Sequence, residues 1–245
     1  MSDETKKTET EAAPAQADAA PALKKHKKAV VAVVIVAVLV VAGIGMNIWH
    51  EQPSFCNTIC HIENTYVNNY LQPQNSVGTD KYGNTVSNTN AMMAVLHSHT
   101  QTSAKPEIVC VDCHIPNNAE LAHDGLNYLT GNYVYPRNER SDDDLEKWDG
   151  KDGTQFCVNE NCHAYLRGSD GKVDRNKLEQ TTQNMDFNPH SQHHEEIEMT
   201  CTECHKGHRA SVVECTGCHT DVEVPDGWVT KAQSDEIMAN MHNAA

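Results

Sequence analysis

Cysteine and histidine recur in this sequence in one arrangement: two cysteines a few residues apart, with a histidine directly after the second. Three copies have two residues between the thiols, namely Cys110-Val111-Asp112-Cys113-His114, Cys201-Thr202-Glu203-Cys204-His205 and Cys215-Thr216-Gly217-Cys218-His219. Two copies are longer: Cys56 and Cys60 precede His61, and Cys157 and Cys162 precede His163. All ten cysteines of the chain fall into these five pairs.

This spacing is typical of covalent attachment of haem c. Each thiol adds to one vinyl group of a porphyrin, and the adjacent histidine becomes an axial ligand of the iron. The ten cysteines therefore predict five haems, with the five motif histidines as ligands: His61, His114, His163, His205 and His219. Disulfides or zinc sites are the alternatives, but neither requires a histidine after every second cysteine. The prediction of haem attachment is weakest for the two longer motifs, because their loops must pucker before both thiols reach the vinyl groups.

Further histidines are available as second axial ligands. Nine follow residue 49: His50, His97, His99, His123, His190, His193, His194, His208 and His242. We predict that five of them are the distal ligands: His97, His99, His190, His194 and His208. His123 is the alternative to His97 as a distal ligand, and His193 is the alternative to His194. His208 is the strongest candidate, because it follows His205 too closely to turn back to the same iron and would bind a neighbouring haem. Met92 and Met93 are alternative sulfur ligands for the first haem, although packing is the more usual role of methionine.

The haem motifs are preceded by a segment of different character. Residues 1–28, rich in Ala, Glu, Thr and Lys, are predicted to be a disordered cytoplasmic tail. Residues 29–49 are predicted to be a transmembrane anchor, because Ala29 to Met46 is a run of 18 residues without a polar side chain. A cleaved signal peptide is the alternative, although its apolar region is usually shorter.

Lysines next to the apolar run predict the orientation of the chain. Lys24, Lys25, Lys27 and Lys28 precede the run, which places the N-terminus in the cytoplasm by the positive-inside rule. Residues 50–245 are then predicted to form an extracytoplasmic pentahaem cytochrome c domain on the periplasmic side of the cytoplasmic membrane. Covalent haem attachment takes place on that side, so the two signals agree.

Composition predicts how that domain folds. The chain of 245 residues holds only three Phe and three Trp, which gives a thin core. Buried porphyrins would replace that core. The fold class expected is therefore mainly α with much irregular loop: one N-terminal transmembrane helix followed by a haem-nucleated multihaem cytochrome c domain.

Charge limits the partners of the domain. From Glu51 onward there are 29 Asp and Glu against 13 Lys and Arg, which argues against a nucleic-acid partner. An acidic surface suits either a protein partner of complementary charge or solubility alone.

Regular structure is expected in short pieces. Residues 72–90, rich in Asn, Gly, Ser, Thr and Gln, are predicted to form a surface loop, and residues 136–153 an exposed linker. Helices are predicted over residues 91–96, from Asn117 or Asn118 to Leu129, and over residues 174–185 and 231–243.

The basic tail, the single anchor and the haem motifs resemble the membrane-anchored multihaem quinol dehydrogenases of the NapC/NirT/NrfH group. Cys110 to His114, continued by Ile115-Pro116, is similar to that family's second motif, and Tyr66 stands where a tyrosine often follows its first. The C-terminal part, residues 190–219, is similar instead to the tetrahaem domain of flavocytochrome c fumarate reductases. The first motif departs from the quinol-oxidising pattern, because it is one residue longer and has Glu63 where a methionine is often found.

Together these features predict a membrane-anchored pentahaem cytochrome that takes electrons from menaquinol, another quinol or a membrane partner and passes them to a soluble extracytoplasmic reductase in anaerobic respiration. If the protein is an enzyme, it is a quinol dehydrogenase, and Glu63, Lys105 and Asp112 are candidates for handling the quinol protons. Two histidines on every iron would leave no open position, which favours electron transfer over substrate chemistry. The alternatives are a terminal reductase with one open haem iron and an anchoring relay subunit that does not oxidise quinol.

Overall fold

The computed structural model describes residues 22–60, 65–102, 106–114, 118–133, 139–141, 145, 155–191 and 199–241. The chain divides into two compact units, Met1–Ile48 and Trp49–Ala245. The first unit is described from residue 22 onward, and the second contains every cysteine and all but one of the histidines.

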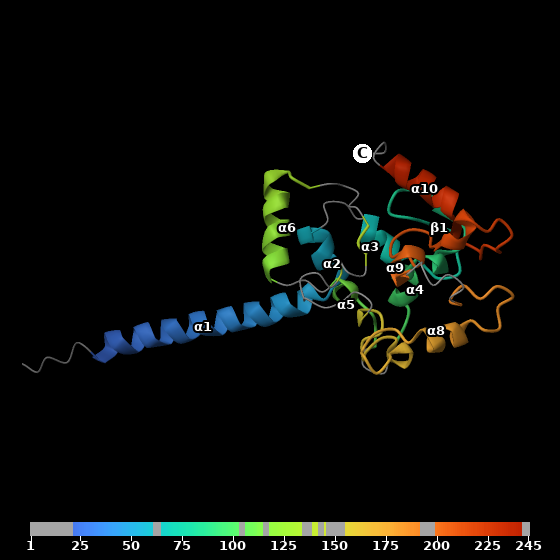
Figure 1. Ribbon diagram of the computed structural model, residues 1–245. Helices are drawn as coiled ribbons and strands as arrows, with labels where there is room; N and C mark the ends of the chain where they lie inside the picture. The colour runs from blue at the N-terminus through green and yellow to red at the C-terminus, as the bar shows by residue number, and fades with distance from the viewer. Residues whose placement is uncertain are drawn as a thin grey trace, which may run out of the picture. The chain divides into compact units, whose positions relative to one another are not determined.

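The first unit is helical in its described part, where it forms most of α1 (Ala22–His50) (Figure 1). The segment Lys27–His50 is long and apolar enough to cross a membrane, and its side chains up to residue 48 are exposed. A helix satisfies its own backbone hydrogen bonds, so an apolar helical surface is stable in contact with lipid. α1 therefore fits a single-pass membrane anchor and contains the predicted anchor, residues 29–49.

In its described part, the second unit consists of short helices joined by irregular segments (Figure 1). The two longest helices are α6 (Asn118–Thr130) and α10 (Lys231–Asn240). The shorter helical elements are α2 (Pro53–Phe55), η1 (Cys56–Cys60), α3 (Thr65–Tyr70), η2 (Thr89–Ala91), α4 (Met93–Ser98), α5 (Cys110–Cys113), η4 (Ala164–Leu166), α8 (Arg175–Thr181), α9 (Cys201–Cys204) and η5 (Glu214–Gly217). Strand β1 (Gly78–Thr79) pairs antiparallel with β2 (Thr85–Val86), and β3 (Val212–Val213) pairs parallel with β4 (Val229–Thr230). The described part agrees with a helical fold that has much loop.

The four predicted helices are present, with shifted ends. α4 begins at Met93, because Ala91 belongs to the preceding turn η2, where the side chain of Asn88 accepts the N–H of Asn90. α8 begins after Asp174, whose carboxylate caps the first turn, and it ends at residue 181 rather than 185. α6 and α10 start where the sequence predicts, and at α10 the side chain of Thr230 caps the first turn by accepting the N–H of Gln233.

Residues 72–90 differ from the predicted surface loop, because part of this segment is buried. Asp80, Lys81, Val86 and Thr89 are each less than 8% exposed. The carboxylate of Asp80 accepts the backbone N–H groups of residues 82 and 84, each over 2.8 Å. A polar composition usually signals solvent, but here the polar groups find their partners inside the protein.

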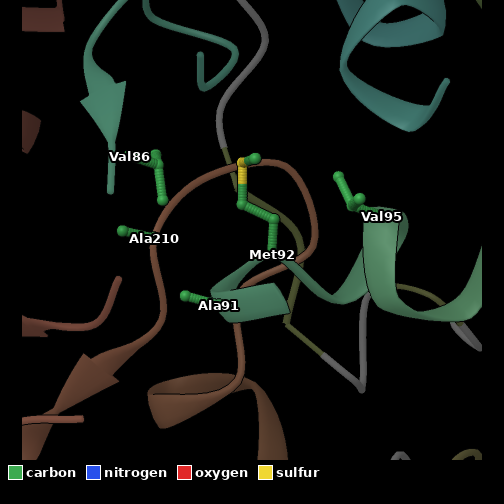
Figure 2. Close-up of a cluster of buried hydrophobic side chains, with 5 residues drawn as sticks. All are labelled: Val86, Ala91, Met92, Val95 and Ala210. Carbon is green, nitrogen blue, oxygen red and sulfur yellow. The ribbon is translucent and has the colours of Figure 1, made fainter. Parts of the chain in front are cut away.

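The described residues of the second unit contain a small cluster of buried hydrophobic side chains. Figure 2 shows its buried members, which come from β2, η2, α4, the residue between η2 and α4, and the residue before Ser211: Val86, Ala91, Met92, Val95 and Ala210. Trp228 and Val229 pack against this cluster. The side chain of Asn69 donates to the sulfur of Met92 over 3.1 Å, so Met92 is held in the core. The cluster itself is small, and other buried apolar side chains of the described residues, among them Phe55, Tyr70 and Phe156, are not part of it.

Replacing Gly227 is expected to destabilise this core. Gly227 has φ +84°, and a Cβ at this position would clash with the carbonyl oxygen of Asn88. We expect Gly227→Ala to lower the free energy of unfolding by about 2–4 kcal/mol, because backbone strain adds to the clash. Gly83 is the matched control: its φ is +85° but a Cβ there meets nothing within 4 Å, so Gly83→Ala should cost about 1 kcal/mol. Denaturant titration of the full-length protein measures both, and equal losses would contradict the close approach.

Candidate haem sites

Each regular motif forms a single helical turn that its histidine closes. The backbone N–H of the histidine donates to the backbone carbonyl of the first cysteine. These bonds join His114 to Cys110 over 2.8 Å, His205 to Cys201 over 2.9 Å and His219 to Cys215 over 2.8 Å. The three motifs therefore share this closing hydrogen bond, although α5 and α9 are α-helical turns and η5 is a 3-10 turn.

An acidic residue caps two of these turns. In α5 the carboxylate of Asp112 accepts the N–H of Val109 over 2.8 Å, and in α9 Glu203 accepts the N–H of Thr200 over 2.9 Å. A carboxylate at the third position of a helical turn satisfies a backbone donor that has no partner within the helix. Asp112 was predicted as a candidate for handling quinol protons. In the structure its carboxylate caps the helical turn of its own motif.

The two longer motifs accommodate their extra residues in different ways. In the third motif the N–H of His163 still donates to the carbonyl of Cys157, over 3.0 Å. Asn159 organises the insertion, because its side chain accepts the N–H of Asn161 over 2.9 Å and donates to the carbonyl of Phe156 over 2.7 Å. In the first motif, residues Cys56–Cys60 form η1, a π-helical turn, whose wider spacing takes up one extra residue.

The motifs lie close to one another in the second unit. A hydrogen bond to Cys110, together with burial, raises the pKa of the Cys56 thiol, so the first motif contacts the second. Burial, and then the charges of Cys162 and Asp112, raise the pKa of Cys113 to about 11, so the third motif lies near the second. Burial raises the pKa of Cys204 to about 11, and the charge of Cys215 contributes to this shift, so the fifth motif lies near the fourth.

Three motif histidines face a second histidine ring. The ring centroids of His114 and His208 are 6.1 Å apart with an interplanar angle of 16°. Those of His163 and His97 are 6.2 Å apart at 77°, and those of His205 and His190 are 6.3 Å apart at 33°. His97, His190 and His208 are all members of the predicted distal set.

The residues around these motifs fit a porphyrin. Among the described residues the cysteines carry thiols and form no disulfide. Tyr165 is 64% exposed and its ring lies 5.8 Å from that of His163, while Phe187 is 36% exposed and lies 6.5 Å from His219. These aromatic faces beside motif histidines are surface that a haem would cover.

Burial favours the neutral form of His205, the form that binds a metal. Burial, and then the nearby His190, His163 and His97, lower the pKa of His205 to about 4. Its buried Nδ1 has no hydrogen-bond partner among the described residues. Burial likewise lowers the pKa of His163 and of His190.

Other predicted residues lie away from the motif histidines or outside the described part of the chain. His99 is exposed, and its Nε2 donates to the carbonyl of Gln72 over 3.1 Å. His123 is exposed on α6, with its Nδ1 3.2 Å from the amide nitrogen of Asn127. The ring of His50 lies 4.8 Å from that of Phe55. Outside the described residues are His61, Glu63, Lys105, His193, His194 and His242, and of Cys60 only the backbone is described.

Comparison with known proteins decides the family. The chain is similar to the cytochrome c-type protein Cgr1 of Eggerthella lenta, with 45% identity over 218 residues that cover 89% of this chain and 94% of the relative. The chain belongs to the cytochrome c-type proteins. No family model matches it, and no solved structure matches it. As a c-type cytochrome the protein carries covalently bound haem c and transfers electrons.

Sequence reasoning missed the residues that orient the facing histidines of this cytochrome. The Nδ1 of His97 lies 2.8 Å from the carbonyl of Met93, and that of His208 lies 3.0 Å from the side-chain oxygen of Asn69. The Nδ1 of His190 lies 3.1 Å from the hydroxyl of Thr182. A helix that includes His97 predicts the bond to Met93 four residues earlier, but no sequence signal links Asn69 to His208, which is 139 residues away.

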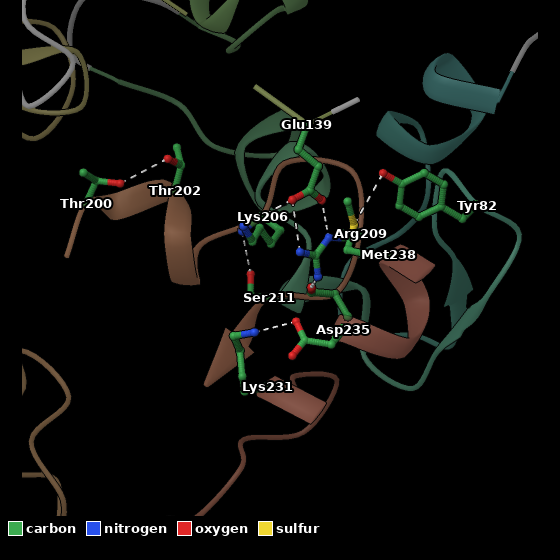
Figure 3. Close-up of polar contacts among 11 residues, drawn as sticks. Tyr82, Glu139, Thr200, Thr202, Lys206, Arg209, Ser211, Lys231, Asp235 and Met238 are labelled. Carbon is green, nitrogen blue, oxygen red and sulfur yellow. Dashed lines mark hydrogen bonds and ion pairs between the residues drawn. The ribbon is translucent and has the colours of Figure 1, made fainter. Parts of the chain in front are cut away.

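A group of charged side chains fixes the segment that follows the fourth motif (Figure 3). The carboxylate of Glu139 accepts two hydrogen bonds from Arg209, which is 2% exposed, and lies 3.2 Å from the amine of Lys206. Burial alone would raise the pKa of Glu139. The hydrogen bond and charge of Arg209, together with the charges of Lys206 and Lys81, have the larger effect and lower this pKa. Within the predicted exposed linker 136–153, Glu139 is therefore drawn into the protein by the cations.

Removing the charge of Glu139 is expected to destabilise the cytochrome. We expect Glu139→Gln to lower the free energy of unfolding by about 2–4 kcal/mol, because the buried guanidinium of Arg209 loses its counter-charge. Asp235→Asn is the control, since Asp235 is 63% exposed in its ion pair with Lys231 and should change stability by less than about 1 kcal/mol. Denaturant midpoints of the two holoproteins make the comparison. Similar midpoints for both variants would show that the Glu139 group contributes no more than a surface ion pair.

Proposed function

We propose that this protein is a membrane-anchored pentahaem cytochrome that relays electrons from the quinol pool, or from a membrane partner, to a soluble extracytoplasmic reductase. The proposal rests above all on five Cys-His motifs, four of which have the same backbone closure in the described part of the chain. Each haem, when bound, supplies a one-electron centre whose potential the axial ligands and burial adjust.

The proposed haem ligands are the motif residues and the predicted distal histidines. The attachment residues are Cys56, Cys60, Cys110, Cys113, Cys157, Cys162, Cys201, Cys204, Cys215 and Cys218. The axial ligands are His61, His114, His163, His205 and His219 from the motifs, with His97, His99, His190, His194 and His208 as distal candidates. Of the distal candidates, His99 has the least support from its surroundings, because its Nε2 is bonded to a backbone carbonyl.

Electrons would enter at the first motif, next to the end of the apolar segment. Trp49 donates to the hydroxyl of Ser54 over 3.1 Å, and its ring packs edge-on against Phe55 at 5.1 Å. Cys56 comes directly after Phe55 in the sequence. The first attachment residue is therefore next to a residue that packs on Trp49, and tryptophan is common at membrane interfaces. The neighbouring motifs support a relay from the first to the second, onward to the third, and between the fourth and fifth.

The role in quinol oxidation is supported by resemblance to the NapC/NirT/NrfH group. The proposed location of the haem domain is the periplasmic side of the cytoplasmic membrane, with the N-terminus in the cytoplasm, in an anaerobic respiratory chain. Glu63 and Lys105 are the proposed proton-handling residues of the first haem. The acidic domain is proposed to meet a reductase whose docking face is basic.

Two measurements on the purified, detergent-solubilised protein test the proposal. Haem quantified per chain should be about five, the number that the Cys-His motifs require. A menaquinol analogue should then reduce the haems rapidly, as followed at their absorbance bands. Full haem loading with reduction by dithionite but not by the quinol analogue would exclude quinol oxidation and favour an anchored relay. Carbon monoxide binding by the unmodified reduced protein would favour a terminal reductase with an open iron.

A further inference from the structure

We propose that helix α6 lies on the membrane surface, with its apolar side buried between the lipid headgroups and the outer part of the acyl chains. The proposal rests on the membrane anchoring proposed above, and it does not depend on quinol oxidation or on the number of haems. The second unit would then contact the lipid bilayer directly, in addition to being attached to the anchor at residues 29–49.

α6 has apolar residues on its exposed side. Leu126 is 60% exposed and Leu129 is 82% exposed, and Ala122 and Gly125 are exposed beside them. These four positions share one face of the helix, because they are spaced by three or four residues. We call Ala122, Gly125, Leu126 and Leu129 the apolar face of α6.

The other side of α6 is polar and partly covered by protein. Asp124 and Asn127 lie on that side, and both are partly buried. A helix on the surface of a soluble protein normally has the reverse arrangement, with its apolar residues turned toward the core. An apolar face that is turned outward is typical of contact with lipid or with a partner.

The end of α6 adds two exposed tyrosines to this surface. The N–H of Gly131, which has φ +72°, donates to the carbonyl of Tyr128 over 3.2 Å, and the N–H of Asn132 donates to that of Asn127 over 2.9 Å. The helix ends in this turn, and the ring of Tyr133 lies 6.0 Å from that of Tyr128. Both tyrosines are exposed, at 43% and 48%. Tyrosine is enriched at membrane–water interfaces, because its ring is apolar and its hydroxyl stays hydrated.

The position of α6 within the second unit favours lipid over a partner protein. α6 packs beside η1, the turn Cys56–Cys60. Trp49 belongs to the same unit, lies at the end of the apolar segment, and packs edge-on against Phe55, the residue before η1. Because the anchor would hold Trp49 at the lipid surface, the neighbouring η1 and α6 would also lie close to that surface.

The charge of α6 indicates which force would bind it. Residues Asn118–Thr130 include no Lys or Arg, and they include two acidic residues, Glu120 and Asp124. Binding would therefore come from burial of apolar area and not from attraction to anionic lipids, which draws basic segments to membranes. We expect the contact to be the same with neutral and anionic lipids and at low and high salt.

Site-specific photo-crosslinking in the full-length, haem-loaded protein tests the proposal. Benzoylphenylalanine replaces Leu129 or His123, and each variant is reconstituted into phosphatidylcholine vesicles with or without phosphatidylglycerol. His123 is the matched control, because its side chain is 59% exposed on the same helix but outside the apolar face. After illumination, position 129 should give lipid adducts in several-fold higher yield than position 123, as measured by mass spectrometry of the chain.

A probe in the anchor separates failure of this proposal from failure of the anchoring. Leu39, which is 65% exposed on α1, should also give lipid adducts when benzoylphenylalanine replaces it. Adducts at position 39 without adducts at position 129 would overturn the proposal and leave the anchor intact. No lipid adduct at either position would refute the anchoring and the proposal together. Adducts from position 129 to protein in place of lipid, whether to the same chain or to a second copy, would also overturn the proposal.

A second measurement applies if the variant at position 129 does not fold. Hydroxyl-radical footprinting of the unmodified protein in phosphatidylcholine nanodiscs reports which exposed side chains lipid covers. After correction for intrinsic reactivity, Tyr128 and Tyr133 should be oxidised several-fold less than His123. Equal oxidation of the tyrosines and His123 would show that water reaches this surface, and the proposal would be wrong.

Discussion

Replacing both Cys201 and Cys204 by serine is expected to remove the folded state of the second unit and not merely one haem. The variant should lose more than one haem per chain and become sensitive to limited proteolysis, with most of the far-ultraviolet helical signal of residues 49–245 gone. The stability lost would be comparable to the whole free energy of unfolding of a domain, on the order of 5–15 kcal/mol. Haem staining and mass spectrometry of the purified chain measure the effect.

The reason lies in what the segment after the fourth motif holds. The carbonyls of Lys206, Gly207 and His208 accept N–H groups from Met93, Ala94 and Lys81, which belong to two other parts of the unit. Arg209 binds Glu139, and Ser211 donates to the carbonyl of Ala91 in the core. Because the hydrophobic cluster beside this segment is small, we expect the haem fixed at its start to determine the segment's position.

The fifth motif is the matched control for this variant. Cys218 is exposed, and its motif lies beside α10 at the end of the described chain. Cys215→Ser with Cys218→Ser should remove one haem and leave the rest of the unit folded. If the two double variants lose haem and protease resistance equally, segment 205–211 is not the organising centre of the unit.

Much of the haem chemistry is predictable from local sequence. Attachment depends on two thiols and a histidine within a few residues, so spacing alone predicts each motif. Local sequence also anticipates how helices begin, as Asp174 and Thr230 show by capping α8 and α10. The apolar run that predicts the anchor is likewise a local property.

Pairing between segments is not predictable in the same way. From the sequence, His97 and His99 are equally good candidates for a distal ligand. In the structure α4 ends at Ser98, between them. The ring of His97 therefore lies near that of His163, whereas the ring of His99 is bonded to Gln72. The polar residues 72–90 look like surface, yet Asp80 and Thr89 are buried with internal partners. Both features depend on tertiary contacts that neither composition nor periodicity encodes.

His208→Ala is expected to open the iron of the second haem. The reduced variant should bind one carbon monoxide per chain, and one rhombic low-spin EPR signal, which near-parallel rings at 16° produce, should disappear. The potential of that haem should shift by on the order of 0.1 V, since axial ligands govern haem potentials over a range of about 0.8 V. His123→Ala, which removes an exposed histidine whose ring lies beside Asn127, is the control and should change none of these properties.

A double variant decides which iron His208 serves. His208 follows the fourth motif in sequence but faces His114 of the second motif, so removing the second haem by Cys110→Ser with Cys113→Ser should make the further change His208→Ala silent. The chain would then gain no high-spin haem and no carbon monoxide binding beyond that of the cysteine variant. If His208→Ala still opened an iron in that background, His208 would be a ligand of another haem. Changes that act on one site are not additive, so an additive effect would show that His208 and the second motif serve different haems.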